Sequence, residues 1–115
     1  MIEIEALDYF EKLLLEKMAQ ENISFAFKDK DSLNDEDGAF IPATRSIYIL
    51  DCYNDPLIDN RKNKLFIIAH ELGHHFKGAS EDAARAYIRE ICDNLPKEAE
   101  ALLKRDIDYY SAPGR

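Results

Sequence analysis

Residues 70–74 read His-Glu-Leu-Gly-His, and this string constrains the fold more than any other feature of the chain. Histidines four positions apart, here His70 and His74, lie on one face of an α-helix, where both rings can bind the same metal ion. Glu71 lies beside them and can reach a water on the metal rather than the metal itself. That water, acidified by Zn²⁺, would lose its proton to Glu71 and attack a carbonyl carbon. The string therefore predicts a helix with a hydrolytic zinc site, against the alternative that the spacing arose by chance.

The residues around the string favour a metal site over chance. Ile67, Ile68 and Ala69 stand directly before it and predict a buried helix, which suits a site that excludes water. His75 follows the string at once, but at about 100° per residue it lies far round the helix from the other two histidines. We therefore expect His75 to be a surface or supporting histidine, and the chain contains no further one.

A catalytic zinc has three protein ligands and one open position, so the site needs a third ligand. The metzincin pattern places a glycine three residues and a histidine six residues after the second histidine, but Lys77 and Ser80 stand there and exclude it. A carboxylate is then expected, and the next helix offers Glu81. On a helical wheel Glu81 is the only charged residue inside the apolar arc of that helix, whereas Arg85 and Glu90 fall outside.

Glu81 has two interpretations. An acid in the first turn stabilises the helix dipole by roughly 0.3 kcal/mol or more, and that role does not require it to face inward. As a metal ligand it must face the motif helix, and a short loop through Gly78 would bring it near His74. We therefore predict His70, His74 and Glu81 as the ligands, with Glu90 as the alternative third one.

Hydrophobic periodicity predicts a single α+β domain over residues 1–115. An N-terminal helix is expected first, followed by a small antiparallel sheet, the motif helix and two further helices. Gly78 suits the end of the motif helix, Asp59 or Asn60 its N-cap, and Ser80 the N-cap of the helix that follows. The expected helices cover about residues 4–20, 61–77, 81–95 and 96–110, and the expected strands cover residues 23–27, 39–41 and 46–50. In the last two helices we expect burial of Ile88, Ile91, Leu102 and Ile107, and exposure of Arg89, Asp93 and Lys104.

Composition narrows the class of protein further. The net charge is −8, from 23 acidic and 15 basic residues, which argues against a nucleic-acid-binding surface. No apolar run approaches the ~20 residues of a membrane helix, and the acidic N-terminus is unlike a signal peptide, so a cytoplasmic protein is expected. Cys52 and Cys92 are too few for a disulfide scaffold and are expected to be free thiols.

Three motifs occur in order between Gly38 and Tyr87. They are Ser46-Ile47-Tyr48-Ile49, then Ile68-Ala69-His70-Glu71-Leu72-Gly73-His74, then Glu81-x-x-Ala84-Arg85-x-Tyr87. Together they resemble the ImmA/IrrE family of zinc metallopeptidases, which also occurs in phages and mobile elements.

The resemblance implies a gluzincin-like minimal zincin fold, with His70, His74 and Glu81 on zinc and Glu71 as the general base. Known members of the family cut helix-turn-helix repressors. The resemblance therefore implies a protein substrate of that kind. From the net charge and the lack of a long apolar run, we expect no direct contact to nucleic acid or membrane.

Two functions are consistent with the sequence. The first is a zinc endopeptidase that holds an extended substrate by strand addition to an exposed sheet edge, expected at Ser46 to Leu50. The second is a non-catalytic module that keeps the zincin fold and binds a repressor or another protein. Glu71 favours the enzyme, because a binding module needs no base there, whereas the small size and short C-terminal region favour the module. No oxyanion-stabilising residue can be assigned, and Tyr87, Tyr109 and Tyr110 are candidates only through their phenol groups.

Overall fold

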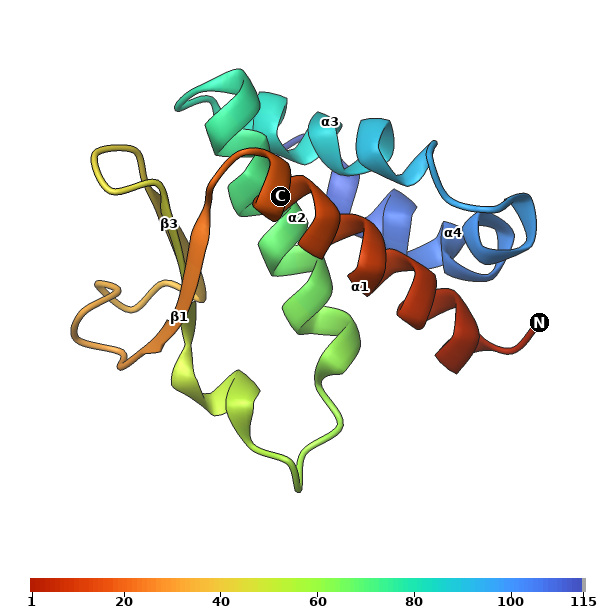
Figure 1. The fold of residues 1–115 in the computed structure, drawn as a ribbon, viewed down its shortest axis with the longest axis horizontal. Helices are drawn as coiled ribbons and strands as arrows, with labels where there is room; N and C mark the ends of the chain where they lie inside the picture. The colour runs from red at the N-terminus through yellow and green to blue at the C-terminus, as the bar shows by residue number, and fades with distance from the viewer. Residues whose placement is uncertain (115) are drawn as a thin grey trace.

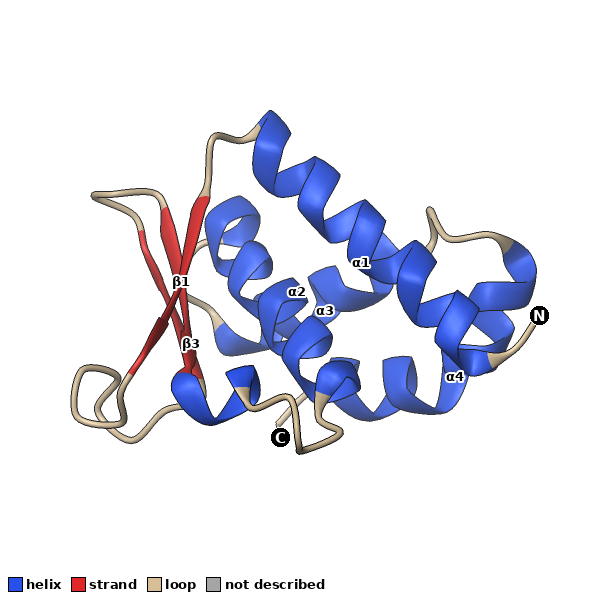
Figure 2. Ribbon diagram, turned by 60° about the horizontal axis from the view of Figure 1, so that its bottom comes forward, coloured by secondary structure: helices blue, strands red, loops and turns tan. Residues whose placement is uncertain are grey.

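A computed structural model describes residues 1–114 and shows four α-helices on one side of a three-stranded sheet, of which α2 packs against the strands (Figures 1 and 2). The chain is α+β, as predicted. Within residues 1–114, no helix has the length and apolarity needed to cross a membrane. The elements are α1 (Glu3–Gln20), β1 (Ser24–Lys28), β2 (Gly38–Ile41), β3 (Ser46–Leu50), the short 3-10 helix η1 (Asp51–Asn54), α2 (Arg61–Lys77), α3 (Glu81–Cys92) and α4 (Lys97–Ser111).

The sheet is mixed, with strand order β1-β3-β2. β2 and β3 are antiparallel, as predicted, but β1 runs parallel to β3, with Ser24 opposite Ser46 and Lys28 opposite Leu50. The prediction of a purely antiparallel sheet is therefore wrong. β1 and β3 are joined by a long connection that contains β2, and only such a crossover allows a parallel pair.

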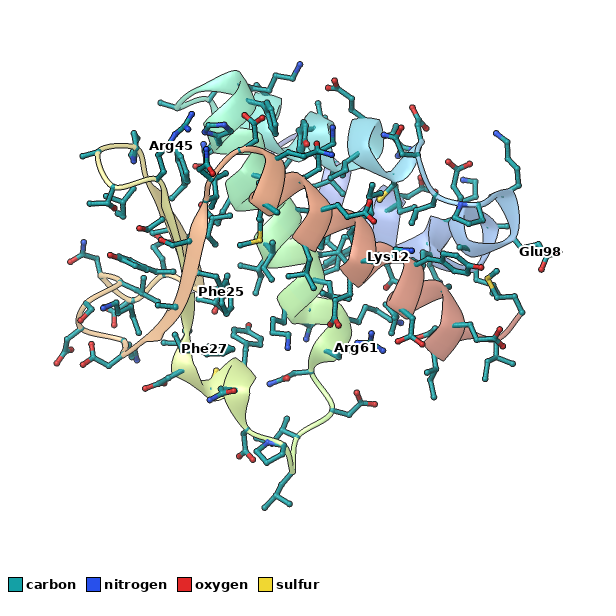
Figure 3. All side chains as sticks on the ribbon, viewed as in Figure 1. Lys12, Phe25, Phe27, Arg45, Arg61 and Glu98 are labelled. Atoms are coloured by element: carbon teal, nitrogen blue, oxygen red, sulfur yellow. The ribbon has the colours of Figure 1, made fainter. Side chains whose placement is uncertain are left out.

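The predicted sheet edge at Ser46–Leu50 is also wrong, because β3 is the central strand. Ile47 and Ile49 of β3 are completely buried against the helices, as expected of a central strand with one covered face. Phe25 and Phe27 of β1 stand opposite them in the register and project toward the same side (Figure 3). The edges of the sheet are β1 and β2.

The motif helix α2 lies between the sheet on one side and α1 and α3 on the other (Figure 1). Phe10 of α1 contacts Phe66 of α2, with ring centroids 4.9 Å apart. α4 packs against α1 and α3 and completes the helical layer. The predicted stripe of α1 is confirmed as part of the core, since each member is buried: Leu7, Phe10, Leu14 and Met18.

The connection from α2 to α3 is short, and Gly78 and Ser80 fix where one helix ends and the next begins. Gly78 ends α2 with a φ of +88°, in the region that favours glycine, and Ser80 caps α3 by accepting a hydrogen bond from the amide of Ala83 at 3.2 Å. The two helices then cross in backbone contact. A Cβ on Gly73 would lie 2.6 Å from the carbonyl oxygen of Ala84, so only glycine allows this approach.

Two sequence predictions about helix surfaces are corrected. Leu102 is 41% exposed and the adjacent Leu103 is buried, because α4 packs through Ala99, Leu103 and Ile107 at a spacing of four. Asn60 occupies the N-cap position of α2, but its side chain donates to the carbonyl of Cys52 at 3.1 Å and does not cap the helix. The remaining burial predictions for the last two helices are confirmed, with Ile88, Ile91 and Ile107 buried and Arg89, Asp93 and Lys104 exposed. α3 ends at Cys92, three residues before the expected end.

Candidate metal centre

Two helices bring the three predicted ligands together. His70 and His74 lie one turn apart on α2, and Glu81 is the first residue of α3. The Oε2 atom of Glu81 lies 2.9 Å from Nε2 of His70, and its Oε1 atom lies 2.9 Å from Nε2 of His74. One carboxylate therefore faces both imidazoles, whose ring centroids are 4.9 Å apart.

The hydrogen bond of His74 determines which ring nitrogen carries a proton. Nδ1 lies 2.9 Å from the carbonyl oxygen of Gly78, and because a carbonyl only accepts, Nδ1 is the donor. In the neutral ring, Nε2 is then an acceptor that faces a carboxylate oxygen of Glu81 at 2.9 Å. Two acceptors at this distance favour a cation between them, either a proton or a metal ion. The end of α2 thus turns Nε2 of His74 toward Glu81, the orientation that a metal ligand at this place would need.

The imidazole of His70 favours its neutral form. Burial lowers its pKa, and the carboxylate of Glu81 offsets only part of that effect. A metal ion binds the neutral ring, so the environment of His70 also suits ligation.

The donor set fits a metal ion. The three ligand atoms lie within 4.8 Å of one another, and in a tetrahedral site with bonds of ~2.0–2.1 Å the ligand atoms are about 3.3 Å apart. Two imidazole nitrogens and one carboxylate oxygen also match a catalytic zinc site with an open position. This is the one such group of histidine, cysteine and acidic residues found among residues 1–114. Glu90, the alternative third ligand, instead pairs with Lys77 at 3.2 Å.

Glu81 approaches the histidines from the solvent and not, as the helical wheel predicts, from the core. Its side chain is 60% exposed, compared with 20% for His70 and 16% for His74. The predicted direction was wrong because α3 begins at the rim of a cleft, where the sector that faces α2 is open. Glu81 therefore closes the ligand group from outside.

Glu71 is buried beside the ligands, with 6% exposure. Burial raises the pKa of its carboxyl to about 7, an effect that His74 opposes and that Glu81 and Glu36 increase. A carboxyl that titrates near neutral pH can accept and release a proton under ordinary conditions. Its place in the sequence and its environment both suit a general base.

The ligand group opens into a cleft of about 910 Å³ between the sheet and the helices. One wall is β2 with the residues directly before it, and the other wall comes from α2, α3 and the end of α4. The cleft is therefore large enough for a segment of polypeptide beside the metal-binding group. Its lining outside the ligands includes Glu36, Asp37, Phe40, Ile67, Arg85 and Tyr110.

His75 lies away from the ligand group, as predicted. Its Nε2 atom lies 2.8 Å from a carboxylate oxygen of Glu21 at the end of α1, and its ring contacts Phe40 of β2. The side chain is 13% exposed, so His75 is a supporting residue rather than a surface one. It links the motif helix to α1 and to the strand that lines the cleft.

One cleft residue escaped the sequence analysis. Arg85 was placed on the outer side of α3, yet its side chain is 12% exposed and pairs with Glu81 and Asp82. The spacing of four residues from Glu81 was the signal that could have identified it. Of the three tyrosines considered in the sequence, Tyr110 lines the cleft, where it stacks on Phe66 and its hydroxyl donates to Asn63.

The other two tyrosines considered in the sequence lie elsewhere. Tyr87 is buried against Phe76, and Tyr109 is 54% exposed. Neither belongs to the lining of the cleft.

Comparison of the chain with protein-family models, with curated proteins and with solved structures gives no match.

Proposed function

We propose that the protein is a zinc-dependent endopeptidase that hydrolyses a peptide bond of a protein partner. The observation that carries the proposal is the convergence of His70, His74 and Glu81 in an open cleft beside the buried Glu71. The proposed partner is a helix-turn-helix repressor of a phage or mobile element. That part rests on the resemblance of the sequence motifs to the ImmA/IrrE family.

Each residue has a role in the proposed reaction. His70, His74 and Glu81 would hold zinc, which supplies Lewis acidity toward a water and the substrate carbonyl. Glu71, a carboxyl buried beside the ligand group, accepts the proton of the attacking water and passes it to the departing amine nitrogen. A carbon–oxygen bond forms, the carbon–nitrogen bond breaks, and Glu71 returns to its starting state.

The free edge of β2 supports the binding of an extended substrate. Within residues 1–114, β2 pairs on one side only, and it lines the cleft. Because the amide of Leu50 donates to the carbonyl of Asp37, the antiparallel alternation directs the N–H and C=O groups of Gly38 and Phe40 to the free edge. A substrate strand could pair with these groups. β3, the strand expected to dock the substrate, already has both edges occupied.

The test compares wild type with Glu71→Gln, using as substrate a candidate helix-turn-helix repressor chosen from the neighbouring genes. We expect the variant to fold, hold zinc and bind the repressor, because Glu71 does not belong to the ligand group. Cleavage should fall by about 10² to 10⁴-fold, since an amide cannot accept the proton. Fragments are followed by mass spectrometry, and Glu36→Gln, which removes another carboxylate of the same cleft, should still cleave.

Equal cleavage by wild type and Glu71→Gln would contradict the role of Glu71 and indicate a contaminating protease. Tight binding by both, with no cleavage by either, would favour the alternative function of a non-catalytic binding module.

A further inference from the structure

Arg85 is a cationic side chain in an unusual environment. It lies one turn after Glu81 on α3, lines the cleft, and is 12% exposed. Arginine is rarely buried to this extent unless its charge is paired. Its Nη2 atom lies 2.7 Å from Oδ1 of Asp82, and its Nη1 atom lies 3.8 Å from Oε2 of Glu81.

Asp82 holds one side of the guanidinium in place. The Oδ1 atom of Asp82 accepts hydrogen bonds from Nη2 of Arg85 at 2.7 Å and from the backbone amide of Gly114 at 3.0 Å. The carboxylate is therefore anchored to the chain beyond α4. Because Asp82 holds the guanidinium, the positions of its other two nitrogen atoms are also fixed.

The other side of the guanidinium is incompletely bonded. The Nε atom of Arg85 is buried and has no hydrogen-bond partner among residues 1–114. A buried donor without a partner destabilises the fold, which is unexpected for a group whose only role is to stabilise it. The nearest ion-pair partner beyond Asp82 is Glu81, at a distance that is too long for a good hydrogen bond.

We propose that Arg85 is a positioning residue of the metal centre, whose guanidinium hydrogen-bonds to the carboxylate of Glu81 and orients it as a ligand. The proposal rests on the metal centre of the proposed function. In the present arrangement both Glu81 oxygens face imidazole nitrogens at 2.9 Å, which leaves Arg85 only the longer contact. A ligand carboxylate binds metal through part of its acceptor capacity and leaves the rest for a neighbouring donor.

Two opposing effects of Arg85 can be separated by experiment. A positive charge near a divalent cation weakens metal binding by repulsion, whereas a donor that orients the ligand strengthens it. Arg85→Met removes the charge and the donors while keeping the length of the side chain. Arg85→Lys keeps the charge but loses the planar fork of donors.

The experiment measures zinc affinity by competition with a chromogenic chelator, together with the absorption spectrum of the Co²⁺-loaded protein. We expect Arg85→Met to lose about 10 to 100-fold in zinc affinity and to show an altered Co²⁺ spectrum. Arg85→Lys should also lose affinity. The matched control is Arg89→Met, one turn further along α3, where the guanidinium binds Asp108 and Ser111 and does not contact Glu81, so its affinity should equal that of wild type.

Unchanged or higher affinity in Arg85→Met would overturn the proposal, because repulsion would then equal or exceed orientation. If Arg85→Met does not fold, Arg85→Lys decides, and wild-type affinity in that variant would overturn the proposal in the same way. Absence of zinc binding by the wild type would instead contradict the metal centre itself, so the two failures are distinguishable.

Discussion

The two walls of the cleft are built in opposite ways. On the helical wall, α2 and α3 approach until backbone meets backbone at Gly73 and Ala84. The sheet wall is the four-residue strand β2, half-buried throughout and preceded by an exposed acidic segment that includes Glu36 and Asp37. The candidate ligands all come from the helical wall. Groups that must keep fixed distances thus stand on the close-packed side, and an unpaired backbone edge stands on the other.

Both walls act on the proton affinity of Glu71. Burial raises its pKa most, His74 of the helical wall lowers it, and Glu81 of the helical wall and Glu36 of the sheet wall both raise it. The sheet wall thus acts on Glu71 without contributing a candidate ligand. This division of roles is what the following predictions test, beginning with the largest effect.

The largest effect should follow from removing ligands of the helical wall. We expect about one zinc per chain in protein purified without chelator or added metal, and loss of that zinc in the His70→Ala/His74→Ala variant, because two of three ligands disappear. Elemental analysis measures the content. His75→Ala is the matched control and should keep its zinc, since His75 binds Glu21 instead. Full occupancy in Glu81→Ala would show that the third ligand is misassigned.

The two cysteines should differ strongly in reactivity. Burial raises the pKa of Cys92 on α3 to about 12 from a usual 9.0, whereas Cys52 after β3 is exposed. A thiol reagent should therefore label one cysteine quickly in the native protein and both in denaturant. Cys52→Ser should abolish the fast phase. Two fast thiols in the native protein would mean that the helical side is less closely packed than described.

Two tyrosines should ionise about two pH units above the usual pKa of tyrosine, one in the helical layer and one beside the sheet. Burial raises the pKa of Tyr87 on α3 and of Tyr53 in η1 to about 12, and Asp37 adds to the shift of Tyr53. Because the folded state disfavours both phenolates, their contribution to stability is complete below pH 10 and is lost as the pH rises through 12.

Ultraviolet absorbance during alkaline titration measures these ionisations, and Tyr87→Phe and Tyr53→Phe should each remove one late group. Asp37→Asn should lower the pKa of Tyr53 alone, since it removes a nearby negative charge. A shift of Tyr87 in that variant would show that the two sides are electrostatically coupled.

The smallest effect, of about 1–3 kcal/mol, is expected for Gly73→Ala. Helix propensity alone predicts that this change raises the free energy of unfolding by roughly 1 kcal/mol. The added Cβ would lie 2.6 Å from the carbonyl oxygen and 2.7 Å from the Cα atom of Ala84, which are backbone atoms that cannot turn aside. We therefore expect the opposite sign in urea denaturation. A stabilised variant would show that α3 can move away from α2 without loss.

The sequence predicted the helices well because each carries its own signal. The stripe of α1, the glycine that ends α2 and the serine that caps α3 are local features, and all three act as expected. His70 and His74 could be identified from the sequence for the same reason, since their spacing alone puts them on one face of the helix.

Features that depend on distant parts of the chain were not predictable in the same way. The sequence of β1 does not indicate that it pairs with β3 rather than with β2, so β3, the central strand, was taken for an edge strand. Glu81 was identified correctly as the residue that meets the histidines, but its side chain was expected to point into the core. It approaches them from the solvent, which depends on how deep the cleft is at the start of α3. Arg85 was assigned to the outer surface because a wheel cannot show that Asp82 and Glu81 draw it into the cleft.

The register of the sheet has a consequence for the order of folding. Ile41 and Ser46 of the β2–β3 hairpin meet across a four-residue turn, whereas Ser24 reaches Ser46 only after the whole intervening segment has closed. Closing a longer loop loses more chain entropy, and hairpins form in about 1–10 μs, so the β2–β3 pair can form before β1 is added. The contacts between α2 and α3 are also local in the chain. Most of both walls of the cleft, with the three candidate ligands, can therefore assemble from residues 36–92, and α1, β1 and α4 then pack against this part.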